Sequence, residues 1–338
     1  MAENKGTIKR TLDYISFAIS SFFNSLSIKK PDVVYSTSPH IFAPFGAIAY
    51  SFIKRAPHVL EVRDIWPDSI VATTGMSKNS ILYKIFEFFE IFIYKASKQI
   101  VVFTESFKDN LIQKGVPIEK LHVVINGANL SLFHKPIYDI NLARTLKLEK
   151  KFVIGYMGTH GLSHDLLNVI RAASLIDDND IQFLFVGEGA EKLSMINLAK
   201  ELSVLNVHFV GRQSREEIRN YWGICNAGLV HLKNDPVFKT VIPSKIFETM
   251  ASERPIIYCG PDSDGSRLIE KYECGIVVKA DDPETLAVKI TDLKNDLDLC
   301  SKLAENGKRF SPKFSRETQA DETLKVLSYA ANFKKVKK

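Results

Sequence analysis

The sequence predicts an α/β protein built from two doubly wound, Rossmann-like domains. The chain has 338 residues, which is enough for two domains with full-sized hydrophobic cores. Short β-rich runs alternate with helical patterns along it, which is typical of parallel sheets with crossover helices. Its composition, with 45% hydrophobic and 25% charged residues, is that of a globular protein and excludes a collagen-like, coiled-coil or disordered chain.

The first half of the chain predicts four strands and the helices that connect them. Apolar residues spaced three and four positions apart between Leu12 and Leu26 indicate an amphipathic helix before the first strand. The Asn126-Gly127 pair is a turn signal that ends the last strand. Strands are expected at Val33–Tyr35, Val59–Val62, Ile100–Phe103 and Val123–Ile125, with helices at about 40–54, 77–97 and 106–114.

The second half predicts a complete doubly wound domain, because six strands alternate with helices. A further helix over Glu317–Ala331 follows this domain. The strands are expected at Phe152–Met157, Ile181–Val186, Val207–Val210, Gly228–His231, Ile256–Tyr258 and Gly275–Val278, with helices at about 165–176, 189–202, 214–223, 244–251, 264–271, 282–295 and 298–308.

The domain organisation follows from these elements and from the charge distribution. Residues 1–135 carry a net charge of +5, which favours an acidic substrate or an anionic surface near the first half. Residues 136–333 carry a net charge of −3, so a charge-driven nucleic-acid binder is not indicated. We expect a first domain at 1–135, an interdomain connection at 136–150, a second domain at 151–312, a final helix at 313–331 and a basic tail at 332–338.

The cysteines and the hydropathy pattern limit the other classes of protein. The four cysteines have no C-x-x-C spacing, so we interpret them as buried free thiols in a reducing cytoplasm rather than as a zinc or disulfide site. No run reaches the ~18 uninterrupted apolar residues of a membrane span. The sequence therefore predicts neither a metal site nor a transmembrane segment.

Glycine-containing loops follow three consecutive strands of the second half. Two glycines at a turn from strand to helix allow backbone N–H groups to approach a phosphate at the positive helix N-terminus. Each loop alone is a weak signal, but three at one sheet edge favour a shared nucleotide site. None is a complete G-x-G-x-x-G or P-loop motif, so NAD and ATP sites of those kinds are not supported. The loops are Gly158-Thr159-His160-Gly161, Gly187-Glu188-Gly189 and Gly211-Arg212-Gln213.

The segment VFKTVIPSKIFETMASERPII, at 237–257, is the most informative part of the sequence. Pro243 suits the first turn of a helix, and Ser244 is placed to cap it. Lys245 and Glu248 are three positions apart and share a helical face. They form either a surface ion pair, or a cation for a diphosphate beside a carboxylate for ribose hydroxyl groups. Spacing alone favours the surface pair.

The residues of this segment carry a resemblance to a known family. PSKIFETMA followed by PII resembles the donor-site signature of family 4 glycosyltransferases. In order along the chain, GYMGTHGLSHDLL, FLFVGEGAEKLSM, VHFVGRQSREEI and NAGLVHLKND resemble the same family. LEVRDIWPDS and VVINGANLSLF resemble its acceptor domain. The similarity extends from about Lys5 to Ala330 and is greatest for the WbuB-type sugar transferases of bacterial O-antigen and capsule synthesis.

The resemblance implies a GT-B fold and a retaining transferase. In this fold two Rossmann-like domains face each other, the second binds the donor, and a final helix crosses back to the first. The implied donor is a nucleotide-diphosphate sugar, UDP-linked, that carries an N-acetylated amino or deoxy sugar. The implied acceptor is a polyprenyl-diphosphate-linked or other saccharide. No metal or other cofactor is implied, and the enzyme would work in the cytoplasm, in peripheral contact with the inner face of the membrane.

The resemblance also implies roles for individual residues. Glu248 would bind the donor ribose, while Lys245 and Ser244 would face the diphosphate. Lys245 and Arg212 would stabilise the leaving diphosphate, because negative charge develops on it in the transition state. Asp64, with Arg63 beside it, would lie on the acceptor side, where a base and a plain salt bridge are both open interpretations. The remaining donor-side residues would be Gly158, Thr159, His160, Gly161, Gly187, Glu188, Val210, Gly211, Thr240, Val241, Ile242 and Pro243.

The sequence departs from the family pattern at two places. Many members carry a second glutamate eight residues before Glu248, where this chain has Thr240, which can bond a sugar hydroxyl but cannot act as a carboxylate. The first domain also lacks the initial strands of the family, so we expect Val33–Tyr35 to be an exposed edge strand of a shortened reading frame. These departures favour one alternative to a transferase, a non-catalytic remnant that binds only nucleotide. A second alternative is a nucleotide-sugar 2-epimerase, which shares the GT-B architecture.

The helix expected around Ile81–Tyr94 has an unusually broad apolar arc. One interpretation is a core helix packed between the sheet and a neighbouring helix. The other is a membrane-facing surface, because the first half is basic and the implied acceptor is linked to a lipid. The sequence favours the core helix.

Overall fold

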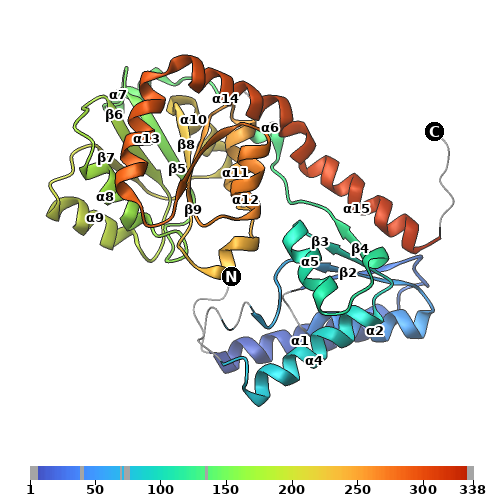
Figure 1. The fold of residues 1–338 in the computed structure, drawn as a ribbon. Coiled ribbons are helices and arrows are strands. Elements are labelled where there is room, and N and C mark those ends of the chain that lie inside the picture. Colours follow the sequence, from blue (N-terminus) through green and yellow to red (C-terminus); the bar gives the residue numbers. More distant parts are fainter. Residues whose placement is uncertain (1–6, 39–41, 69–70, 72–76, 134–135, 333–338) are drawn as a thin grey trace. The chain divides into compact units, whose positions relative to one another are not determined.

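The computed structural model shows two compact α/β units (Figure 1). Unit 1 comprises Met1–Ile125 and Gln319–Lys338, and unit 2 comprises Asn126–Thr318. In both units the described strands form one parallel sheet. The structure describes residues 7–38, 42–68, 71, 77–133 and 136–332.

Unit 2 is built on a six-stranded parallel sheet with the order β10-β9-β8-β5-β6-β7. Numbered within the unit, this order is 3-2-1-4-5-6, that of the doubly wound fold, and the chain reverses direction across the sheet between β5 and β8. Ligands of such sheets bind beyond the carboxyl ends of the strands at this reversal point. The strands are β5 (Phe152–Met157), β6 (Ile181–Val186), β7 (Val207–Val210), β8 (Ala227–His231), β9 (Ile256–Gly260) and β10 (Gly275–Lys279).

Helices cover both faces of this sheet, as Figure 1 shows. Buried side chains of α8, α9, α13 and α14 pack with β5, β6 and β9 in one cluster. Those of α7 and α10 pack with the opposite side of β5 and β6. The helices are α6 (Leu130–Phe133), α7 (Ile140–Thr145), α8 (Leu166–Ser174), α9 (Lys192–Glu201), α10 (Arg215–Ile224), α11 (Ser244–Ala251), α12 (Asp264–Lys271), α13 (Pro283–Asn295) and α14 (Leu297–Phe310), with 3-10 turns η2 (Pro236–Thr240) and η3 (Ser311–Phe314).

The segment expected to connect the domains at 136–150 is instead part of unit 2. Ala143 and Leu148 are fully buried and pack with Val153 and Trp222. The expected boundary was wrong because the short helix α7 has too few residues to show a period, although it closes one face of the sheet. Unit 2 accordingly begins at Asn126 rather than after residue 150.

Unit 1 has a four-stranded parallel sheet with the order β1-β2-β3-β4. β1 lies at one edge of this sheet, and its residues alternate between half-buried and exposed. The central strands β2 and β3 are almost wholly buried. The elements are β1 (Val34–Thr37), β2 (His58–Val62), β3 (Gln99–Val102), β4 (Leu121–Val123), α1 (Thr7–Leu26), α2 (Phe42–Lys54), α4 (Ile81–Ala96), α5 (Glu105–Gln113) and the 3-10 turn η1 (Ile118–Lys120).

The broad apolar arc of α4 is divided between core and solvent. Tyr83, Ile93 and Tyr94 are buried. By contrast, Ile81 is 79% exposed and Phe88 is 67% exposed. The core-helix interpretation therefore describes one face of α4, while its other face presents large apolar side chains to the surroundings.

The last helix, α15 (Arg316–Ala330), belongs to both units. Its first residues lie in unit 2, and the turns from Gln319 onward lie in unit 1. Val326 and Ala330 are buried against Val59 and Val101 in the core of unit 1. The return of the final helix to the first domain, which the family resemblance implies, is thus present in the structure.

Candidate active site

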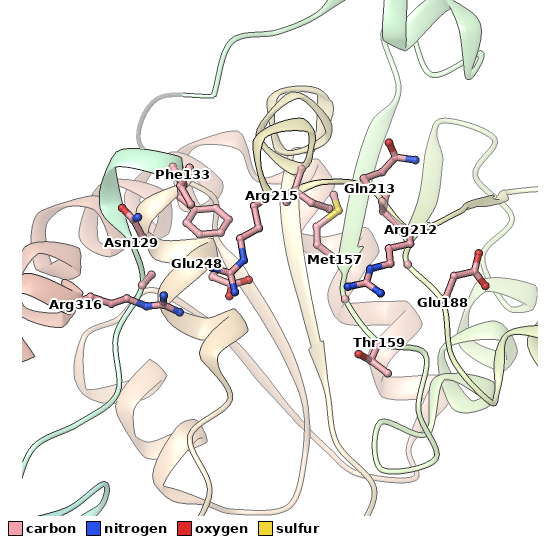
Figure 2. A pocket seen from close by; sticks show the side chains of 16 residues that line it. Asn129, Phe133, Met157, Thr159, Glu188, Arg212, Gln213, Arg215, Glu248 and Arg316 are labelled. Carbon is pink, nitrogen blue, oxygen red and sulfur yellow. The ribbon is translucent and has the colours of Figure 1, made fainter. Parts of the chain in front are cut away.

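A pocket of about 400 Å³ lies in unit 2 where β5, β6 and β7 end. It occupies the carboxyl edge of the sheet, which is the ligand-binding edge of a doubly wound fold. Figure 2 shows that arginines and Glu248 reach toward it from several elements. The lining residues are Ala128, Asn129, Leu132, Phe133, Met157–Thr159, Val186–Glu188, Arg212, Gln213, Arg215, Ile218, Glu248 and Arg316.

Two glycines let the loops after β5 and β6 lie against each other. Gly158 and Gly187 have φ angles of +141° and +151°, which residues with a side chain rarely adopt. A Cβ at Gly187 would lie 1.8 Å from the Gly158 carbonyl oxygen. No side chain fits there, so the backbone itself forms this wall of the pocket.

Lys245 lies directly behind Gly158. Its Cε would be 2.8 Å from a Cβ at Gly158, and its Nζ lies 5.0 Å from the centroid of the Tyr156 ring. Burial lowers the pKa of Lys245, and the charge of Glu248 raises it in part. The ammonium group is therefore held beside the glycine loop from the first turn of α11.

Glu248 lines the pocket from the same helix. Burial raises the pKa of its carboxyl group, and the charges of Lys245, Arg316 and Arg215 lower it, together with a hydrogen bond from Ser244. The expected capping role of Ser244 was wrong: Pro243 occupies the cap position and makes no side-chain cap bond, while Ser244 is the first helical residue. Its hydroxyl points one turn along the helix, toward Glu248.

Sequence reasoning missed two of the pocket's arginines, Arg215 and Arg316. They are the first residues of α10 and α15, and both follow a serine that caps the helix. A cation at a helix N-terminus is disfavoured by the helix dipole. The sequence Ser-Arg-Glu occurs at both 214–216 and 315–317 and places a basic residue at a helix start, where an acidic one is favoured. This pattern could have identified the two arginines as candidate binding residues.

The predicted donor-side residues fall into two groups. Six of them line the pocket: Gly158, Thr159, Gly187, Glu188, Arg212 and Glu248. Glu188 lies at its rim, where Lys192 is bonded to it at 2.7 Å and lowers the pKa of its carboxyl group. The others lie outside the lining: Lys245 directly behind it, and His160, Gly161, Val210, Gly211, Thr240, Val241, Ile242, Pro243 and Ser244.

His160 is not part of the pocket lining. Its side chain is fully buried, and it packs on the rings of Tyr156 and Phe185. Within the described part of the chain, neither ring nitrogen has a hydrogen-bond partner. Burial, with help from the charge of Lys192, lowers the pKa of His160 to about 4. The imidazole is thus a neutral packing element under the glycine loop.

Arg63 and Asp64 lie in unit 1, directly after β2. Arg63 pairs with Glu61 at 3.1 Å rather than with Asp64. Among the described residues no ion pair to Asp64 is present, and Asp68 pairs with Lys78 and Lys114. Within the described residues, the ion pair considered for Asp64 is therefore not present. Burial raises the pKa of its carboxyl group, and Arg63 lowers it in part.

Two further findings concern metals and membranes. Within the described residues, no group of three or more His, Cys, Asp or Glu side chains is arranged to hold a metal ion. None of the described helices is both long enough and apolar enough to cross a membrane.

The fold and the pocket define a doubly wound α/β protein with a candidate ligand site at the carboxyl edge of its sheet. Comparison with protein families makes this specific. The family described as "Glycosyl transferases group 1" matches residues 138–310, and the "Glycosyl transferase 4-like domain" matches residues 11–127. The first match alone covers just over half of the chain, so the protein belongs to the group 1 glycosyltransferases. The predicted enzyme class is confirmed.

Curated relatives agree with this assignment. The chain is 26% identical over 277 residues to the probable glycosyltransferase WbjE of Pseudomonas aeruginosa, covering 81% of this chain and 68% of WbjE. It is also 26% identical over 299 residues to WcaI of Escherichia coli K12, which carries the name of a colanic acid biosynthesis glycosyl transferase. This match covers 86% of the chain and 73% of WcaI.

Solved structures show the fold. HepE of Anabaena, crystallised in complex with UDP, superposes with a TM-score of 0.76 at 16% identity, over 93% of this chain and 82% of HepE. A glycosyltransferase of Rickettsia africae superposes with a TM-score of 0.72 at 17% identity, over 99% of this chain and 84% of that one. The predicted GT-B fold is confirmed.

Proposed function

We propose that this glycosyltransferase takes its sugar from a nucleotide-diphosphate donor, UDP-linked, and builds a bacterial surface polysaccharide. The observation that carries the proposal is the gathering of cations around one carboxylate in the 400 Å³ pocket. The complex of HepE with UDP and the name of WcaI support the donor and the type of product.

The cations sit where helices disfavour them. Arg215 and Arg316 begin α10 and α15, and Lys245 lies in the first turn of α11. Each cation at a helix N-terminus costs about 0.3–1 kcal/mol. A diphosphate bound among them would offset this cost, because it pairs with the side chains and also receives the favourable end of each dipole. The arrangement therefore suits an anionic ligand with more than one charge.

The roles of the side chains in transfer follow from this chemistry. Glu248 accepts hydrogen bonds from the ribose hydroxyl groups, while Lys245 and Arg212 neutralise the diphosphate. When the bond from the sugar carbon to the diphosphate breaks, charge grows on the leaving oxygen, where preorganised cations are most effective. We infer a retaining reaction in which these cations take the place of a metal, and in which Thr240 bonds a sugar hydroxyl.

The acceptor side belongs to unit 1 in our proposal. Asp64 is the candidate carboxylate there, since a raised pKa makes it a better proton acceptor than an ordinary aspartate. We propose a lipid-linked saccharide, for example on polyprenyl diphosphate, as acceptor. The exposed apolar side chains of α1, α2 and α4 support peripheral contact with the inner face of the cytoplasmic membrane.

The test is nucleotide binding and transfer by the whole chain. We expect UDP to bind, measured by calorimetry with GDP and CMP as comparisons. Glu248→Gln should weaken UDP binding by about 10–100-fold, because charge-assisted hydrogen bonds to the ribose are lost. Glu305→Gln, on an exposed part of α14, is the matched control and should bind UDP like the wild type.

The outcomes separate the candidate functions. Transfer of radiolabelled sugar from a UDP donor to a lipid-linked acceptor supports the transferase. UDP binding without any transfer identifies a nucleotide-binding remnant. Binding that Glu248→Gln leaves unchanged contradicts the assignment of the pocket.

A further inference from the structure

We propose that Arg316 is a positioning residue for Glu248. Arg316 is hydrogen-bonded to the segment at 127–128, and from there its charge keeps the Glu248 carboxyl group ionised and able to accept hydrogen bonds from the donor. The inference rests on the proposed function for the identity of the ligand. Figure 2 shows Arg316 and Arg215 on the same side of the pocket as Glu248.

Arg316 is held firmly by its own neighbours in unit 2. Its backbone N–H donates to the Ala128 carbonyl at 3.0 Å, and its Nε donates to the Gly127 carbonyl at 3.4 Å. Ala128 N–H donates in turn to the Phe314 carbonyl at 2.9 Å. A Cβ at Gly127 would lie 2.3 Å from the Phe314 oxygen, so the two segments approach as closely as backbones can. The backbone and the Nε of Arg316 are therefore anchored by hydrogen bonds to the segment at 127–128.

The charge around Glu248 comes from three elements. Lys245 acts from the same helix, Arg316 from α15 and Arg215 from α10, and all three lower the pKa that burial raises. The Ser244 hydroxyl adds a hydrogen bond. Among the described residues, no ion pair within 4 Å joins Glu248 to either arginine. The two arginines thus favour the charged form of Glu248 without themselves forming an ion pair with its carboxylate oxygens.

This separation is what ribose recognition needs. A carboxylate that accepts two hydroxyl groups must be ionised, because a protonated one presents a donor in place of an acceptor. A direct ion pair would occupy the same lone pairs. An arginine stays charged at any pH the enzyme meets, so its support does not vary.

A direct test measures the titration of Glu248 in the intact protein. The chain is labelled with carboxyl-¹³C glutamate, and the Glu248 signal is assigned by its loss in Glu248→Gln. We expect Arg316→Gln to raise the pKa of Glu248 above its wild-type value, because a nearby cation is removed from a partly buried site. Arg316→Lys, which keeps the charge, should restore most of the wild-type value.

Arg212→Gln is the matched comparison, since Arg212 lines the same pocket but is not among the groups with the largest effect on the pKa of Glu248. It should leave the pKa of Glu248 unchanged. An unchanged pKa in Arg316→Gln overturns the proposal. So does an equal rise in Arg212→Gln, which would indicate a general effect of pocket charge.

A second measurement follows UDP affinity against pH. Affinity should fall as the pH drops through the pKa of Glu248, and this fall should occur at higher pH in Arg316→Gln than in the wild type. A common pH dependence for both proteins counts against the positioning role. If no variant binds UDP at any pH, the proposed function fails, while the titration of Glu248 still decides what Arg316 does.

Discussion

Units 1 and 2 share one architecture but bury their surfaces differently. In unit 2, β5, β8 and β9 are buried along their whole length, and charged groups gather in one pocket. In unit 1, β1 is an edge strand with half-exposed residues, and large apolar side chains of α1, α2 and α4 face outward. The difference indicates that unit 2 is built to enclose a small anionic ligand. Unit 1 instead exposes an apolar surface.

The largest expected difference between the units is in how much folding stability each loses when the pH is lowered. Burial lowers the pKa of His160, His164 and His231 in unit 2 to about 4, and that of His58 in unit 1 likewise. The unfolded pKa lies near 6.5, so the unfolded state takes up protons first as the pH falls. Between pH 6.5 and pH 5 the free energy of unfolding should therefore fall by about 1–2 kcal/mol for each of these histidines.

The chain offers a reporter for each unit, because Trp66 lies in unit 1 and Trp222 in unit 2. Urea unfolding of Trp66→Phe follows unit 2, and that of Trp222→Phe follows unit 1. Unit 2 should lose stability more steeply between pH 6.5 and 5. An equal loss in both units would contradict the assignment of these buried neutral histidines.

Gly187 tests the tight backbone packing that unit 2 uses to form its pocket. Gly187→Ala should cost about 3 kcal/mol or more, since the new Cβ meets the Gly158 oxygen at a φ angle suited only to glycine. Gly161→Ala is the control, because its Cβ would make only ordinary contacts, the nearest at 3.6 Å. Thermal unfolding of the two variants measures the difference, and equal melting temperatures would show that the two loops move apart freely.

The apolar face of unit 1 should matter least for stability. Phe88→Ser removes a side chain that is 67% exposed, so the free energy of unfolding should change by less than about 0.5 kcal/mol. Sedimentation with anionic liposomes should nevertheless decrease, because buried apolar area in the membrane interface is lost. The exposed Leu205→Ser in unit 2 is the control. No sedimentation of the wild type at low or high salt would end the membrane proposal.

Local patterns predicted most of the fold. The six strands of unit 2 were expected within two residues of their observed ends, because each is a short apolar run between turn signals. The strands of unit 1 were expected within about two residues. The short helix α7 was missed because six residues carry no readable period, and its burial depends on Trp222, far away in the sequence.

Patterns of neighbouring residues were enough to predict the fold class, the glycine loops after β5 and β6, and the shared helical face of Lys245 and Glu248. These features are written in residues that are neighbours along the chain, where propensity and spacing act. The presence of Arg215 and Arg316 in one pocket with Glu248, and the full burial of His160, depend instead on contacts between distant segments. The ends of distant helices converge there because sheet order, not sequence distance, sets which residues share a pocket.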